Sequence, residues 1–257
     1  MTVTPAYKAR GDGPVLLFLH GIGGNQDSFD DQLPHFADRY MAVAWDMPGY
    51  GATPLPAEPL TFDLLADAAA SVIDALAVEQ AHVVGHSMGG MVAQTLVKRH
   101  PGRVASLVLS GTSPAFGKPG GDWQEQFLAA RLKPLDEGKT PADFADVLVD
   151  GMWGDNGDAA AKARAARSMK ALAADSYRAA LKCIVTFDER DNLPNIACPT
   201  LCLAGEKDTN AAPSVMEKMA AKIPGCAYHC MPGVGHLANV ERPDLFNAAI
   251  DAFLEGL

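Results

Sequence analysis

The feature that most constrains the fold of this chain is a serine flanked by glycines, at the point where a strand gives way to a helix. An apolar run at 81–84 leads into Gly85-His86-Ser87-Met88-Gly89, and a helical pattern follows from about Met88 to Arg99. A Gly-x-Ser-x-Gly sequence in this context turns so sharply that the serine is strained and its hydroxyl is exposed. Glycines are needed because neighbouring backbone passes close to both positions. The sequence therefore predicts that Ser87 is a nucleophile whose hydroxyl is exposed where the strand ends, at the top of the sheet.

Short apolar runs separated by helical patterns predict the rest of the sheet. The predicted strands lie near 6–10 and at 15–19, 41–45, 81–84, 104–109, 200–204 and 227–231. The clearest helical pattern spans 61–78, and a last amphipathic helix spans 243–253. Strands that alternate with helices require crossover connections, and these produce parallel pairing. We therefore expect an α/β fold with a mostly parallel sheet flanked by helices.

The alternation stops between the fifth and sixth of these strands. Residues from about 113 to 194 are alanine-rich and helical in pattern, and the run 159–174 has strong helix propensity. We expect residues 115–194 to form a helical cap inserted before the last two strands, with 1–114 and 195–257 forming the core. An insertion here lies over the carboxyl ends of the strands, where open α/β sheets bind ligands. The cap is expected to cover a substrate, although a structural appendage would have the same pattern.

A serine hydroxyl needs a base to act as a nucleophile, and the base needs an acid to orient it. After a strand–turn–helix nucleophile, both come later in the chain, on loops that follow later strands. Asp208 follows the strand at 200–204, and His236 lies on a late, glycine-rich loop after the last strand. Glu206, two residues earlier, competes with Asp208 as the acid. We predict Ser87, Asp208 and His236 as nucleophile, acid and base.

Two backbone N–H groups are expected to stabilise the oxyanion that forms when the serine attacks a carbonyl. The Met88 N–H lies at the N-terminus of the predicted helix, where the helix dipole favours negative charge. The second donor should follow the strand at 15–19, where the sequence reads His20-Gly21-Ile22-Gly23-Gly24. The Ile22 N–H is the predicted donor, and a simple glycine-rich turn is the alternative for this stretch.

Candidate substrate contacts come from the cap and from the two catalytic loops. Trp123 and Trp153 offer apolar surface to a small organic molecule, or pin the cap helices together. Arg131 lies on a predicted helix, where it can bind a substrate carboxylate through two N–H groups or lie at the solvated surface. Gly21 and Leu237, beside the predicted oxyanion donor and base, complete the predicted substrate-binding set.

Five motifs taken together resemble the α/β-hydrolase superfamily over the whole chain except the cap. They are His20-Gly21-Ile22-Gly23-Gly24, Asp46-Met47-Pro48-Gly49-Tyr50-Gly51, Gly85-His86-Ser87-Met88-Gly89-Gly90, Gly205-Glu206-Lys207-Asp208 and Gly233-Val234-Gly235-His236. Within the superfamily, the stretches 87–94 and 235–243 resemble 3-oxoadipate enol-lactonases and related esterases. The resemblance implies hydrolysis of a small ester or lactone, in aromatic compound degradation for the enol-lactonases. The serine mechanism itself needs no cofactor.

Two alternatives stay open. Carbon–carbon bond hydrolases of meta-cleavage pathways are close relatives within the superfamily, and they usually carry Ser-Trp soon after the first glycine-rich loop. This chain reads Asn25-Gln26-Asp27-Ser28-Phe29 there, which matches that pattern only in part. Other proteins of this fold are small-molecule receptors without turnover, and fold alone does not separate them from enzymes. The intact set of Ser87, Asp208 and His236 favours an enzyme.

Composition excludes several classes of partner. A formal net charge of −10 would repel a phosphate backbone, so nucleic acid is not an expected partner. No apolar run approaches the ~18 residues of a membrane span and no secretory leader is visible, so we expect a cytoplasmic protein without membrane contact. The five cysteines are expected to be reduced and free of metal, because no Cys-x-x-Cys spacing accompanies them. The sequence leaves a homodimer open.

Overall fold

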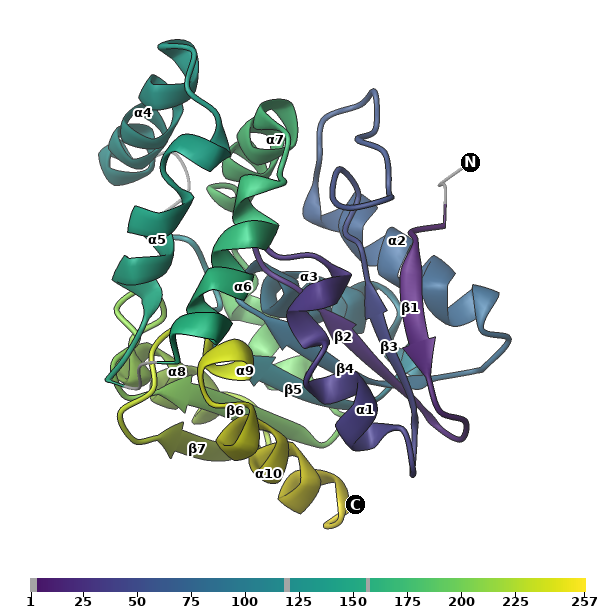
Figure 1. Cartoon of the computed structure of the whole chain (residues 1–257). Helices are drawn as coiled ribbons and strands as arrows, with labels where there is room; N and C mark the ends of the chain where they lie inside the picture. Colours follow the sequence, from purple (N-terminus) through teal and green to yellow (C-terminus); the bar gives the residue numbers. More distant parts are fainter. Residues whose placement is uncertain (1–3, 118–120, 156–157) are drawn as a thin grey trace.

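The computed structural model describes residues 4–117, 121–155 and 158–257 (Figure 1). In these ranges seven strands form one sheet in the order β1-β3-β2-β4-β5-β6-β7. The strands are β1 (Tyr7–Arg10), β2 (Val15–Leu19), β3 (Met41–Trp45), β4 (Ala81–His86), β5 (Val104–Ser110), β6 (Thr200–Gly205) and β7 (Ala227–Met231). Strand β1 pairs antiparallel with β3, and the other neighbours pair parallel. The expected α/β fold with a mostly parallel sheet is confirmed.

Helices cover both faces of the sheet. The α-helices are α1 (Gln32–Phe36), α2 (Phe62–Ala75), α3 (Met88–Arg99), α4 (Asp122–Asp136), α5 (Ala145–Met152), α6 (Ala159–Lys170), α7 (Ala174–Ile184), α8 (Pro213–Ala220), α9 (Ala238–Glu241) and α10 (Pro243–Leu254). Leu17 and Leu19 of β2 share a core cluster with α2 and α3, whereas Leu16 and Phe18 share one with α1 and α10. A strand covered on both faces is apolar throughout, which explains the run at 15–19. In the described part of the chain, no helix combines the length and the apolar character that crossing a membrane requires.

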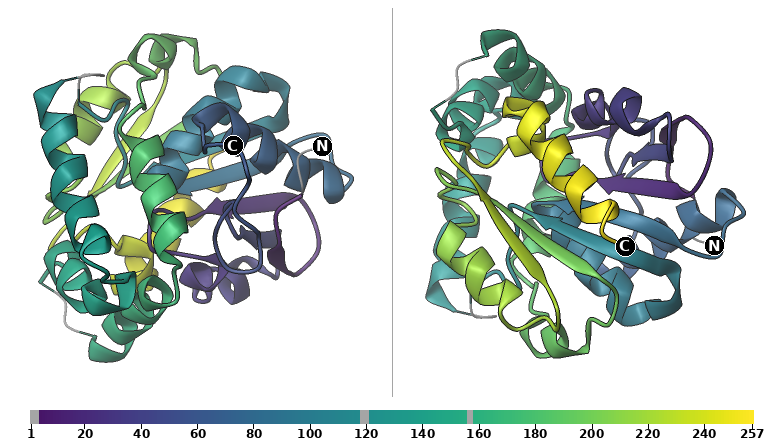
Figure 2. Two further views of the ribbon diagram at one scale, coloured as in Figure 1. Left: turned by 90° about the horizontal axis from the view of Figure 1, so that it is seen from above. Right: turned by 90° about the horizontal axis from the view of Figure 1, so that it is seen from below.

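Helices α4 to α7 lie between β5 and β6 in the chain and gather at one end of the molecule (Figures 1 and 2). We call residues 115–194, which contain them, the cap segment. Its two ends meet, because Ala115 and Asp188 form an antiparallel bridge and the Phe116 N–H donates to the Phe187 carbonyl at 2.9 Å. The segment therefore leaves and re-enters the core at one place, between neighbouring strands.

Three elements differ from the sequence prediction by two residues or more. Strand β4 continues two residues further than predicted and carries the chain directly to the serine turn. Helix α2 is shorter than the predicted 61–78, since Thr61 caps its start and Ala77 has a positive φ of 56°. The helical run at 159–174 breaks before Ala174, where α7 begins. Basic residues in the last turn of α6 and an acidic residue in the first turn of α7 favour an end and a new start there.

Candidate active site

Ser87 connects β4 to α3 with a backbone conformation that few residues other than glycine adopt. Its φ is 53° and its ψ is −121°. The Ser87 N–H donates to the Ser110 carbonyl at 2.9 Å, and the Ser87 carbonyl accepts from the Thr112 hydroxyl at 2.8 Å. Backbone strain of this kind persists only where the surroundings enforce it. The strained turn predicted from the Gly-x-Ser-x-Gly motif is confirmed.

Close backbone contacts explain the glycines around this turn. A Cβ on Gly85 would lie 2.5 Å from the Gly89 carbonyl oxygen, and a Cβ on Gly89 would lie 2.1 Å from the Leu19 carbonyl oxygen. A Cβ on Gly21 would lie 2.7 Å from the Ser87 Cβ. The absence of side chains at Gly85 and Gly89 therefore lets β2, β4 and α3 meet at the turn, and its absence at Gly21 lets the loop after β2 approach Ser87.

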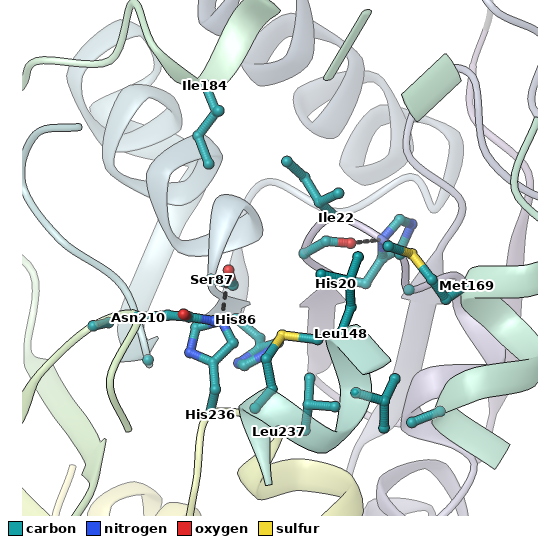
Figure 3. A pocket seen from close by; sticks show the side chains of 18 of the residues that line it. His20, Ile22, His86, Ser87, Leu148, Met169, Ile184, Asn210, His236 and Leu237 are labelled. Carbon is teal, nitrogen blue, oxygen red and sulfur yellow. Dashed lines mark hydrogen bonds between the residues drawn. The ribbon is translucent and has the colours of Figure 1, made fainter. Parts of the chain in front are cut away.

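His236 and Asp208 meet Ser87 at the carboxyl edge of the sheet. The His236 Nε2 atom lies 3.0 Å from the Ser87 Oγ, and its Nδ1 atom lies 2.8 Å from Asp208 Oδ2. Figure 3 shows the Ser87 and His236 side chains pointing toward one another. Asp208 follows β6 and His236 follows β7, and parallel pairing brings the ends of these strands together. Because Nδ1 faces a carboxylate, it carries the ring proton, and Nε2 is left to accept a proton from the serine. The structure thus brings together the three residues that chain order predicted.

The Asp208 carboxylate is held in its ionised form. Burial alone would raise the pKa of Asp208, but the charge of His236 and two backbone donors outweigh it, and the net pKa lies below its usual value. The donors are the N–H groups of Asn210 and Ala211, which reach Asp208 Oδ1 at 2.8 and 2.9 Å. Oδ2 is therefore left for the imidazole, whose ring orientation Asp208 fixes.

The two predicted oxyanion donors lie on the loops that meet at the serine. Met88 is the first residue of α3, so its N–H has no acceptor within the helix. The Ile22 N–H and the Gly21 carbonyl belong to the same peptide group. The Gly21 carbonyl accepts hydrogen bonds from His20 Nδ1 at 2.9 Å (Figure 3) and from the Gly24 N–H at 3.1 Å. Since N–H and C=O point in opposite directions in a trans peptide, these bonds set the direction of the Ile22 N–H. The role of both groups as oxyanion donors stays a prediction.

Two further histidines beside the site are uncharged at neutral pH. Burial lowers the pKa of His20 to about 4 and that of His86 to about 3, and the charge of His236 adds to the shift at His86. His20 Nε2 also accepts a hydrogen bond from the Met47 N–H at 3.0 Å, and a protonated ring could not accept it. His236 is thus the imidazole placed to exchange a proton with Ser87.

A cavity of about 460 Å³ opens beside Ser87 and His236, between the strand ends and the cap segment (Figure 3). Of the predicted substrate contacts, Gly21, Trp123, Arg131 and Leu237 line it, and so does Ile22. In the described part of the chain Trp153 does not, which corrects the expectation from the sequence. The backbone becomes extended at Trp153, where α5 ends, and the Lys162 ammonium lies 5.8 Å from the centroid of the Trp153 ring.

Sequence reasoning missed much of the apolar wall of the cavity. That wall includes Leu148 of α5, Met169 of α6 and Tyr177, Leu181 and Ile184 of α7. The spacing of the α7 residues gives one helix face, which the sequence pattern contains. A lining face and a core face have the same pattern, so only the tertiary structure distinguishes them.

The charges that line the cavity are positive, although the chain as a whole has 31 acidic and 21 basic residues. Among the described residues, no Asp or Glu lines the cavity, and no three metal-binding side chains form a group that could hold an ion.

Two arginines line the cavity, and they differ in their partners. Arg164 is paired with Asp31. Arg131 has no ion pair in the described ranges, and its guanidinium lies 5.5 Å from the Phe127 ring centroid. Burial raises the pKa of the Tyr177 hydroxyl, and the adjacent Arg131 opposes that shift.

The motifs and the fold match a known family model. The model described as alpha/beta hydrolase fold matches residues 14–243, which include the loops that carry Asp208 and His236, the serine turn and the cap segment.

Individual relatives match along nearly the whole chain. A 3-oxoadipate enol-lactonase from Acinetobacter baylyi is 26% identical over 249 residues, covering 96% of this chain and 90% of the relative. A hydrolase from Pseudomonas aeruginosa is 30% identical, with a TM-score of 0.85 over 96% of this chain and 93% of that structure. A thermophilic esterase from Thermogutta terrifontis, solved with malate bound, is 25% identical with a TM-score of 0.88 over 98% and 93%.

Proposed function

The chain belongs to the α/β-hydrolase fold family, and from this membership we propose that it is a serine hydrolase that cleaves a small carboxylic ester or lactone through an acyl-enzyme. Its relatives include an enol-lactonase and an esterase, so hydrolysis itself is the activity that family and relatives support. One observation carries the finer proposal. Ser87, His236 and Asp208 are linked by contacts of 3.0 and 2.8 Å beside a cavity that can hold a small molecule.

In the first half of the reaction the serine is acylated. Ser87 Oγ attacks the carbonyl carbon while His236 Nε2 takes the hydroxyl proton, and Asp208 stabilises the imidazolium that forms. The N–H groups of Ile22 and Met88 bind the oxyanion, each contributing on the order of 3 kcal/mol to transition-state stabilisation. His236 then gives the proton to the leaving alkoxide or enolate, and the acyl group stays on Ser87.

In the second half water releases the acid. His236, neutral again, takes a proton from a water molecule that attacks the acyl-enzyme carbonyl, and the same N–H groups bind the second oxyanion. Collapse of this intermediate returns the proton to Ser87 and frees the carboxylic acid. Every proton and bond in this cycle is accounted for by the triad, the substrate and water, so the proposal names no cofactor.

The charge of the cavity supports a substrate that carries a carboxylate. Arg131 lines the cavity without an ion pair among the described residues, and no acidic side chain there competes for it. A guanidinium binds a carboxylate through two parallel N–H donors. The lactone of an oxodicarboxylic acid, such as 3-oxoadipate enol-lactone, keeps one carboxylate free. We include such lactones, and with them a step in aromatic compound degradation, in the proposed substrate class.

Burst kinetics with p-nitrophenyl acetate test the acyl-enzyme. We expect a release of p-nitrophenolate equal to the enzyme concentration, together with a mass increase of one acetyl group on the peptide that contains Ser87. A protein that binds the ester without any release would be a receptor of this fold. A protein that cleaves carbon–carbon bonds of a meta-cleavage product faster than any ester or lactone would support the other alternative.

A further inference from the structure

The structure assigns Glu241 a positioning role in the proposed hydrolysis. We infer that its buried carboxylate holds the loop of His236 to the end of α5, so that the predicted base and the cap segment are positioned as one unit. The inference rests on the proposed function, since it takes His236 as the base. Figure 1 shows the end of α5 beside the loop between β7 and α9.

One carboxylate oxygen of Glu241 binds two backbone donors from distant parts of the chain. Glu241 Oε2 accepts from the Gly235 N–H at 2.8 Å and from the Gly154 N–H at 3.1 Å. Gly235 directly precedes His236, and Gly154 follows the last turn of α5 by two residues. The oxygen therefore lies at the point where the cap segment and the base loop touch.

Direct backbone bonds reinforce this junction. The His236 N–H donates to the Met152 carbonyl at 2.8 Å, and the Asp155 N–H donates to the Gly233 carbonyl at 2.8 Å. The main chain of His236 is thus bonded to the cap segment itself, and its neighbour Gly235 is bonded through Glu241. A displacement of the end of α5 would consequently shift the imidazole relative to Ser87.

Stability alone does not account for a carboxylate at this position. Glu241 is 3% exposed, it forms no ion pair with Lys or Arg among the described residues, and its Oε1 has no hydrogen-bond partner there. A buried charge that forms no direct ion pair is costly, even with the Arg242 guanidinium near enough to interact electrostatically, and an apolar side chain would avoid that cost. What the carboxylate supplies is two charge-assisted bonds that fix backbone positions. Catalytic groups need to be held to within a fraction of an ångström, which makes this junction a site where position matters.

Glu241→Leu tests the inference, with Glu189→Leu as the matched control. Glu189 is also buried, but it pairs with Lys98 and lies where the cap segment rejoins the core, away from the cavity. We expect Glu241→Leu to lower kcat by about 10- to 100-fold with KM changed by less than about threefold, as for a misplaced catalytic group. The rate at which phenylmethanesulfonyl fluoride labels Ser87 should fall in parallel. Glu241→Gln, which keeps one acceptor oxygen for both N–H groups, should recover most of the rate.

Glu189→Leu should lower the melting temperature while leaving kcat within about twofold of the parent. Equal kcat losses in the Glu241 and Glu189 variants would overturn the inference, and so would an unchanged labelling rate in Glu241→Leu. If Glu241→Leu does not fold, Gly154→Ala replaces it, because its Cβ would lie 2.4 Å from the Gly233 carbonyl oxygen and 2.6 Å from the Gly235 nitrogen. Unchanged kcat and labelling in a folded Gly154→Ala protein would then refute the coupling. A failure of the proposed function would look different: the parent itself would resist sulfonylation, or Ser87→Ala would keep its turnover.

Discussion

The two walls of the cavity are built in different ways. On the strand side, hydrogen bonds of 2.8 to 3.0 Å join Ser87, His236 and Asp208 to one another. Bonds in the same range join Ser87 to the carbonyl of Ser110 at the end of β5 and to the Thr112 hydroxyl, and join Asp208 to backbone N–H groups of the loop after β6. His236 and Asp208 are 5% and 3% exposed. On the cap side the wall is largely apolar, and Trp123 and Val147 are 55% and 74% exposed.

This difference separates the proposed chemistry from the choice of substrate. Hydrogen bonds to fixed backbone groups hold the reacting atoms, so changes on the strand side should act on every substrate alike. Helices that present side chains to the cavity can vary without disturbing those bonds, so changes on the cap side should act on particular substrates. Glu241 lies where the two walls are joined, which makes it the exception.

The sharpest test of the strand side is Ser87→Ala. We expect ester hydrolysis to fall by at least about 10⁴-fold, because the nucleophile is lost while the oxyanion donors remain. The melting temperature should not fall, since Ala keeps the same Cβ in the turn and the Ser87 hydroxyl is bonded to His236 Nε2 rather than to the backbone that holds the turn. Turnover above a few per cent of the parent in pure protein would contradict the assignment of Ser87.

Asp208→Asn and His236→Ala should each reduce kcat by about 10³- to 10⁴-fold or more. In Asp208→Asn the amide oxygen stays with the N–H groups of Asn210 and Ala211, so the amide NH2 faces His236 Nδ1 and donates to it. The ring proton then lies on Nε2, which can no longer accept the serine proton. Combined with Ser87→Ala, neither change should cost much more, because the members of a triad act as a unit. Losses that add in free energy across the double variants would mean that the base or the acid is another residue.

On the cap side, Arg131→Met should act on one class of substrate. We expect kcat/KM for a carboxylated lactone to fall about 10- to 100-fold, the loss of a charge-assisted hydrogen-bonded pair, with little change for a neutral ester of similar size. Arg178→Met is the matched control, since Arg178 lies on α7 and is paired with Asp136 outside the cavity lining. Equal losses on both substrates would place Arg131 in the structure of the cap rather than in carboxylate binding.

The same difference between the two walls explains which parts of the fold and of the candidate site could be predicted from the sequence. Around the sheet, each strand was predicted to within about two residues of its observed bounds, and chain order placed Asp208 and His236 on the loops that meet Ser87. Steric constraints made these predictions possible. Glycines mark the positions where backbone segments approach closely, and a parallel sheet brings the carboxyl ends of its strands together.

In the cap segment, composition gave candidates but not orientation. Trp123 lines the cavity and Trp153 does not, although both follow the same reasoning from side-chain type. The direction of a side chain on a cap helix depends on how that helix packs, which periodicity alone does not contain. The role of Glu241 could not be predicted from the sequence for a related reason. Its hydrogen-bond partners are Gly154 and Gly235, and only the fold brings these residues together.

The smallest expected effect concerns the uncharged histidines under the strand side. In the folded protein, burial lowers the pKa of His20 to about 4 and that of His86 to about 3, below the ordinary value of 6.5. Between pH 6.5 and about 4 the unfolded chain therefore binds protons that the folded chain does not, so the free energy of unfolding falls as the pH falls. The slope is at most about 1.4 kcal/mol per pH unit for each histidine.

Urea unfolding of the parent, Ser87→Ala and His86→Gln at several pH values from 7 to about 4.5 measures this slope. His86→Gln should have a shallower slope than the parent, because it removes one histidine that binds a proton in the unfolded chain but not in the folded chain. Ser87→Ala keeps both histidines and should follow the parent. Equal slopes in all three proteins would mean that His86 is not held neutral by its surroundings, and that the strand side is less rigidly closed to water than its hydrogen bonds indicate.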